Sequence, residues 1–179
     1  MAYTTRPAAS MSHLDRWLAV ARIVVGLYFA KAVITKLGIM TVAGIPLPGA
    51  SARWVATMPK IVSKQAEGNP ILFYKHFLEN TVLTHPQTFA ELTAIGETIT
   101  GIGLTLGLFT GVASVVGLIL SINYGLATQW MSSGQQGFHL LLFTLMLAFF
   151  FSRAGRRWGL DGVIAERKPG SWLTRRPVS

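Results

Sequence analysis

Four long apolar segments alternate with polar connections along the chain, at about residues 17–40, 89–109, 112–128 and 136–152. A helix of about 20 apolar residues rises about 30 Å, which matches the thickness of the hydrocarbon core of a bilayer. The fourth segment has a shorter apolar centre, residues 138–151, and needs its polar ends to reach a comparable length. The pattern predicts an all-α fold, an integral membrane four-helix bundle occupying residues 17–152.

The connection between the first two segments, residues 41–88, contains too much proline, glycine and charge to cross lipid. Two stretches within it, residues 50–63 and 70–83, have the pattern of short amphipathic helices. The second stretch begins with Asn69 as a cap and Pro70 in the first turn. We expect both helices to lie on the membrane interface at the outer face.

Small residues recur at four-residue spacing in the second and third segments, as in Gly103 and Gly107 of one and Gly117 and Ser121 of the other. Small side chains allow two helix backbones to approach closely within a membrane. We therefore expect the second and third helices to form a tightly packed hairpin.

The positive charge of the chain is concentrated at its C-terminal end. The 179 residues are 51% hydrophobic and 13% charged, and they carry a formal net charge of +9. Residues 153–179 hold seven basic residues and follow directly after an apolar segment, as the positive-inside rule describes. This placement favours a basic cytoplasmic tail near anionic lipid head groups over nucleic-acid binding. Four spans then place residues 1–16 in the cytoplasm as well, and those residues lack the pattern of a cleaved signal.

The chain contains no cysteine, which excludes disulfides, thiolate metal sites and covalently attached haem. Redox chemistry would therefore depend on a bound group. His76, His85 and His139 are not spaced as a metal-binding motif, so we expect no metal site.

Charged residues inside the apolar segments are the main candidates for function, because a charge at bilayer depth costs at least about 2.5 kcal/mol. Glu97 lies eight residues, or about 12 Å, inside its helix and should face the protein interior. Lys31 and Lys36 of the first segment both have the length to reach it. Three interpretations stay open: an ion pair that specifies the fold, a quinone or proton site, and a protonated Glu97.

Two further groups of polar residues lie near the ends of the segments. Arg22 is about one turn inside the cytoplasmic end, where we expect its side chain to snorkel to lipid phosphates. Asn123 and His139 belong to a polar group near the outer surface, and a histidine there can exchange protons with a quinone head group.

Several sequence segments together resemble the DoxX/DoxD-like membrane proteins, in the form of the thiosulfate:quinone oxidoreductase small subunit. The resemblance covers about residues 17–160 and is carried by RIVVG at 22–26, ILFYKHFLEN at 71–80, GE at 96–97, GLFT at 107–110, NYGLA at 123–127 and RRWGLD at 156–161. It implies a multi-pass subunit of a bacterial or archaeal cytoplasmic membrane, linked to quinone and to the oxidation of small sulfur compounds with a partner subunit. It also implies a functional core of Arg22, Lys36 and Glu97, with Asn123 as a weaker member.

The sequence thus favours a membrane subunit of a quinone-linked oxidoreductase. Glu97, Lys36 and Lys31 are its candidate catalytic residues, and Arg22, Asn123 and His139 are its candidate cofactor-binding residues. The absence of cysteine excludes a sulfur-exchange step by its own side chains. The alternative is a non-catalytic anchoring subunit that docks against a larger membrane complex. A transporter is less favoured, because four short spans leave little room for a pathway and the halves show no inverted repeat.

Overall fold

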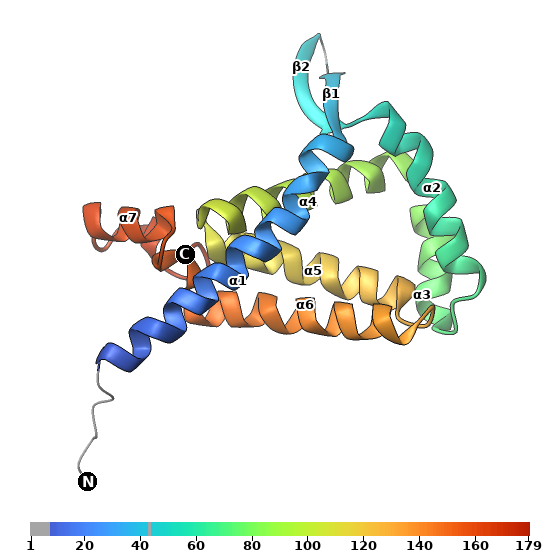
Figure 1. Ribbon diagram of the computed structural model, residues 1–179. Coiled ribbons are helices and arrows are strands. Elements are labelled where there is room, and N and C mark those ends of the chain that lie inside the picture. The colour runs from blue at the N-terminus through green and yellow to red at the C-terminus, as the bar shows by residue number, and fades with distance from the viewer. Residues whose placement is uncertain (1–7, 43) are drawn as a thin grey trace.

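The computed structural model describes residues 8–42 and 44–179 and is mostly helical (Figure 1). The long helices are α1 (Ala8–Thr35), α4 (Pro86–Leu106), α5 (Thr110–Thr128) and α6 (Ser133–Ser152). Along the chain, α1 packs against α4, α4 against α5, and α5 against α6. In Figure 1, α1 runs obliquely to the other three. The helices therefore lie where the apolar segments predict them, with ends that differ by several residues.

Within the described residues, three helices are long and apolar enough to cross a membrane: the His13–Thr35 part of α1, α5 and α6. The fourth predicted span, α4, does not reach the same apolarity, because it contains Glu91, Glu97 and five threonines. Large apolar side chains such as Val24 and Ile34 of α1 are exposed on the helix surfaces. This distribution is that of a membrane protein.

A small antiparallel sheet follows α1, so the prediction of an all-α fold was wrong in this segment. Strand β1 (Leu37–Val42) pairs with β2 (Ile45–Ala50), from Leu37 opposite Ala50 to Val42 opposite Ile45. The predicted span of residues 17–40 is corrected accordingly, since α1 ends at Thr35. The hairpin projects beyond the helices in Figure 1.

The two amphipathic helices predicted for the first connection are present with shifted bounds. Helix α2 (Ala52–Glu67) is capped by Ser51, whose Oγ accepts a hydrogen bond from the main-chain nitrogen of Trp54 at 3.2 Å. Helix α3 (Leu72–Phe77) continues into a π-helical turn, η1 (Leu78–Val82). The buried faces of α2, α3 and η1 form a hydrophobic cluster with residues of α4 and α5.

The closest approach between long helices is that of α1 and α4. A Cβ atom at Gly26 would overlap Thr105, and one at Gly101 would overlap the main chain of Ala30. Glycine at these two positions lets the helix backbones touch. The predicted α4–α5 hairpin is also close, since a Cβ at Gly103 would lie 2.7 Å from that of Ala113.

The segment after α6, for which the sequence predicted a basic tail near lipid head groups, folds back on the turn between α4 and α5. It contains η2 (Ala154–Arg156), α7 (Leu160–Arg167) and η3 (Trp172–Thr174). The Asp161 carboxylate is buried and accepts hydrogen bonds from the main-chain nitrogens of Phe109 at 2.8 Å and Thr110 at 2.9 Å. These bonds satisfy free N–H groups at the start of α5, where a negative charge is also favourable.

Candidate functional site

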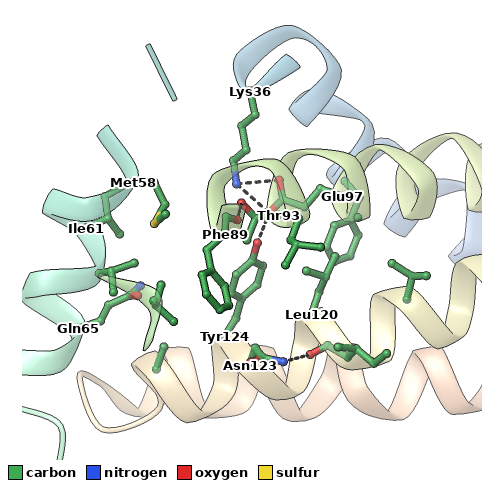
Figure 2. Close-up of a pocket in the computed structure, with 18 of the residues that line it drawn as sticks. Lys36, Met58, Ile61, Gln65, Phe89, Thr93, Glu97, Leu120, Asn123 and Tyr124 are labelled. Atoms are coloured by element: carbon green, nitrogen blue, oxygen red, sulfur yellow. Dashed lines mark hydrogen bonds and ion pairs between the residues drawn. The ribbon is translucent and has the colours of Figure 1, made fainter. Parts of the chain in front are cut away.

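A cavity of about 780 Å³ lies between the long helices and the α2–α3 connection (Figure 2). Its walls come from α1, α2, α3, η1, α4, α5 and α6, and most of the lining side chains are aliphatic or aromatic. The polar groups that face this apolar space are few, so each is a candidate for binding or chemistry. Lys31, Lys36, Glu97, Asn123 and His139, five of the six predicted site residues, line the cavity.

Glu97 is buried in the wall of this cavity and pairs with Lys36. The Nζ atom of Lys36 lies 2.8 Å from both Oε1 and Oε2 of Glu97. The main chain of Lys36 is held on both sides, because its N–H bonds to Ala32 of α1 and its carbonyl accepts from Ser51 at the base of the hairpin. The ammonium group therefore occupies a fixed position beside α4.

Two aromatic residues complete the group around Glu97, and the sequence did not single out either. The hydroxyl of Tyr124, on α5, donates a hydrogen bond to Glu97 Oε1 at 2.7 Å. The side chains of Lys36, Glu97 and Tyr124 point toward one another in Figure 2. The Trp54 ring lies under the Lys36 ammonium, 4.1 Å from Nζ to the ring centroid. Its indole N–H is fixed by the Ala90 carbonyl and the Thr93 hydroxyl. Tyr124 lies in the NYGLA segment, which was the only signal for it.

Lys31 lies in the same cavity wall but does not join this group. Its Nζ sits 4.0 Å from the centroid of the Tyr28 ring, a cation–π contact, and the side chain is exposed. Of the two candidate lysines, Lys36 is thus the partner of Glu97.

Asn123, on α5, is bonded to Tyr74 of α3. Its side-chain amide donates to the Ile119 carbonyl at 2.7 Å, and its main-chain and side-chain oxygens accept from the Tyr74 hydroxyl at 2.9 and 3.2 Å. Tyr74 is buried outside the membrane-spanning helices, and burial raises the pKa of its phenol to about 12. These bonds fasten the connection to α5 at the edge of the cavity.

His139, on α6, also lines the cavity. Tyr124 lies between it and Glu97, since Tyr124 contacts both side chains. The rings of Tyr124 and His139 have centroids 6.4 Å apart. Thr128 donates its only hydroxyl hydrogen to the Tyr124 carbonyl, so it can only accept from His139 Nε2, 2.9 Å away. The Nδ1 atom of His139 is buried and has no hydrogen-bond partner among the described residues. In the neutral ring, Nδ1 is then a free acceptor.

Arg22 lies elsewhere, and its predicted route to lipid phosphates was wrong. Its side chain is completely buried and is not part of the cavity wall. Its guanidinium donates to the main-chain carbonyls of Leu104, Arg157 and Trp158. Arg22 therefore joins α1 to the end of α4 and to the C-terminal segment.

The described residues contain no group of three His, Cys, Asp or Glu side chains placed to hold a metal ion. The family described as the TQO small subunit DoxD matches residues 17–176, which is most of the chain.

The chain belongs to the DoxD family.

This assignment confirms the resemblance found in the sequence and extends it through the C-terminal segment. The DoxD family is that of a membrane subunit of a quinone-linked oxidoreductase, and a small subunit implies a larger complex with a catalytic subunit. No curated protein and no solved structure matches the chain.

Proposed function

We propose that α4 crosses the membrane beside α1, α5 and α6, so that the chain is a four-helix transmembrane bundle with both termini in the cytoplasm of a bacterial or archaeal cell. The charge of Glu97 is the main obstacle to such a span, and its pairing with Lys36 at 2.8 Å offsets that cost. The five threonines add little cost, because a threonine hydroxyl can bond within its own helix, as Thr93 and Thr98 do.

We propose that this DoxD-family subunit binds a quinone in the cavity and supports its reduction, while a partner subunit oxidises a small sulfur compound. The observation that carries the proposal is the Lys36–Glu97–Tyr124 group on the wall of a large apolar cavity. A pair that served only to specify the fold would need no open space beside it.

The residues present fit a quinone. The cavity volume of about 780 Å³ falls within the range of about 300–1,000 Å³ for small-ligand sites. Its apolar walls suit an isoprenoid-substituted ring, and its few polar groups supply hydrogen bonds for ring oxygens. Lys36 can donate such a bond to a quinone oxygen, and His139 Nδ1 can accept one from the hydroxyl of the quinol.

The chain's own residues can hold and move protons at this site. A bound quinone supplies the electron-accepting chemistry, taking up two electrons from the partner and two protons to become a quinol. Glu97 can hold a proton on its carboxyl group, where Tyr124 contacts Oε1 directly. Lys36 balances the negative charge that Glu97 has after it gives up a proton. Asn123 and Lys31 line the wall of the cavity. We assign Arg22 a structural role, because it joins α1 to α4 and to the C-terminal segment.

The test is Glu97→Gln, which keeps the shape of the side chain but cannot exchange a proton. We expect the rate of quinone reduction in membranes that contain the full complex to fall at least about a hundredfold, with unchanged abundance of the subunit. Tyr124→Phe should lower the same rate by a smaller factor. Glu91→Gln is the matched control, because Glu91 is on the same helix, has Gln87 as its one side-chain partner among the described residues and is outside the cavity wall. Unchanged turnover in Glu97→Gln would reject the proposal.

The same variant separates the proposed function from an anchoring role. If a large partner co-purifies in stoichiometric amount and keeps full activity with Glu97→Gln, the subunit is an anchor without chemistry. A partner that co-purifies but loses quinone reduction supports the quinone site.

A further inference from the structure

A second cavity, of about 400 Å³, opens at the far end of the helices from the hairpin. It lies between the first turns of α1 and the chain just beyond α6, and its wall includes Asp15, Leu18, Arg153, Arg156 and Arg157. None of these arginines belongs to the site proposed for quinone. Three arginines in one wall, against Asp15 alone, create a local excess of positive charge.

This positive charge is not neutralised inside the chain. Among the described residues, no carboxylate lies within 4.0 Å of Arg153, Arg156 or Arg157. Arg156 gives one hydrogen bond to the Thr174 carbonyl, whereas the buried Nε of Arg157 has no partner in the described chain. Desolvation and the like charges of Arg156 and Arg176 lower the pKa of Arg153. An anion in the cavity would relieve this repulsion.

The surroundings of the cavity are those of a membrane surface. Trp17 on α1 and Phe151 on α6 are 71% and 61% exposed, and both lie within two residues of the cavity wall in the sequence. The apolar α6 ends at Ser152, immediately before Arg153. Guanidinium groups bind phosphate through paired, charge-assisted hydrogen bonds. A ligand with both a phosphate group and acyl chains can place its phosphate in the cavity and pack its chains on the apolar surface beside it.

We propose that this cavity binds the phosphate group of one anionic phospholipid, whose acyl chains lie along the exposed apolar surface of α1 and α6. Arg153 and Arg157 are its principal phosphate ligands. Asp15 is the acidic member of the wall and weakens binding by repulsion. The site does not depend on quinone or on the function proposed above.

The test measures lipid retained by the full chain in nanodiscs of phosphatidylcholine with increasing phosphatidylglycerol. We expect one tightly held phosphatidylglycerol per chain, detected by native mass spectrometry after transfer to mild detergent. Arg153→Asn removes one charge, and Asn tolerates the left-handed backbone at this position (φ 53°). That variant and Arg157→Gln should each weaken retention about tenfold, and Asp15→Asn should strengthen it. Arg167→Gln, which removes an exposed charge on α7 outside the cavity, is the control.

Each outcome decides the proposal. Equal retention in the three arginine variants would show a diffuse charge effect and overturn it. Inorganic phosphate that binds in detergent while phosphatidylglycerol shows no preference over phosphatidylcholine would also overturn it, because the site would then recognise free phosphate. If Arg157→Gln does not fold, Arg153→Asn and Asp15→Asn, with opposite expected signs, still test the site.

Discussion

Replacing Asp161 with Asn should detach the C-terminal segment from the turn between α4 and α5. The carboxylate is 2% exposed and gives one oxygen to each of two main-chain N–H groups, those of Phe109 and Thr110. Phe109 has a left-handed backbone (φ 48°), which is unfavourable for a bulky residue and needs such support. Asn has the same shape, but an NH₂ group replaces one of the two carboxylate oxygens. That group would face the main-chain N–H of Phe109 or Thr110, which then has no acceptor.

The magnitude follows from these contacts. A buried main-chain N–H left without an acceptor costs about 1–3 kcal/mol. Loss of the negative charge at the start of α5 adds about 0.3–1 kcal/mol. We therefore expect Asp161→Asn to destabilise the docked segment by about 3 kcal/mol, which raises the population of its detached form about a hundredfold.

Trypsin cleavage of the purified chain in mild detergent measures this population, because Arg153 and Arg157 are half-buried while the segment is docked and become accessible when it detaches. Cleavage within the segment should accelerate strongly, and the unfolding temperature should fall by about 6–12 °C. Glu166→Gln, the same kind of change at an exposed position of α7, is the control. If Asp161→Asn behaves like this control, the carboxylate does not hold the segment in place.

Three further predictions concern packing, the ion pair and pH. Gly101→Ala should destabilise the protein by about 1–3 kcal/mol, because the new methyl group would overlap the α1 backbone. Gly137→Ala meets open space inside α6, so the same thermal-unfolding assay should show no loss of stability and a gain of up to about 1 kcal/mol. Lys36→Met leaves its partner carboxylate buried and unpaired, at a cost of about 3–5 kcal/mol, whereas Lys31→Met should stay within about 0.5 kcal/mol; equal losses would contradict the pairing. Tyr74 keeps its proton in the folded state up to its pKa of about 12, whereas the unfolded chain loses that proton near pH 10. The free energy of unfolding should therefore fall as pH rises from about 10 to 12. Tyr74→Phe should make this fall smaller in a pH series of unfolding temperatures.

The long helices could be predicted from the sequence because apolar composition and length decide them locally. The end of the first helix could not, since Leu37–Val42 is as apolar as the helix before it. Pro46 and Pro48 also counted against a strand at β2. Each strand of a two-stranded sheet has a free edge, where proline is tolerated, so the tertiary arrangement overrode the local signal.

The part of the candidate site that could be predicted is the part that contains charged residues, because a charge inside the membrane is costly. That cost singled out Glu97 and limited its partner to two lysines. Choosing Lys36, and finding Tyr124, required the crossing of α1, α4 and α5, because a tyrosine on an apolar helix resembles any core aromatic residue. The fold of the basic tail was hidden for a similar reason, since Asp161 binds main-chain groups that leave no pattern in the sequence.

Helix α1 is attached to α4 by polar bonds at two levels, from Arg22 to the Leu104 carbonyl and from Lys36 to Glu97. The two attachments are fourteen positions apart in the sequence, and each residue inserted into a helix rotates everything beyond it by about 100°. A single insertion or deletion between them would therefore turn one anchor away from its partner. Related sequences should keep the length of this stretch constant even where its exposed side chains differ, which makes the spacing itself a marker for recognising chains built in the same way.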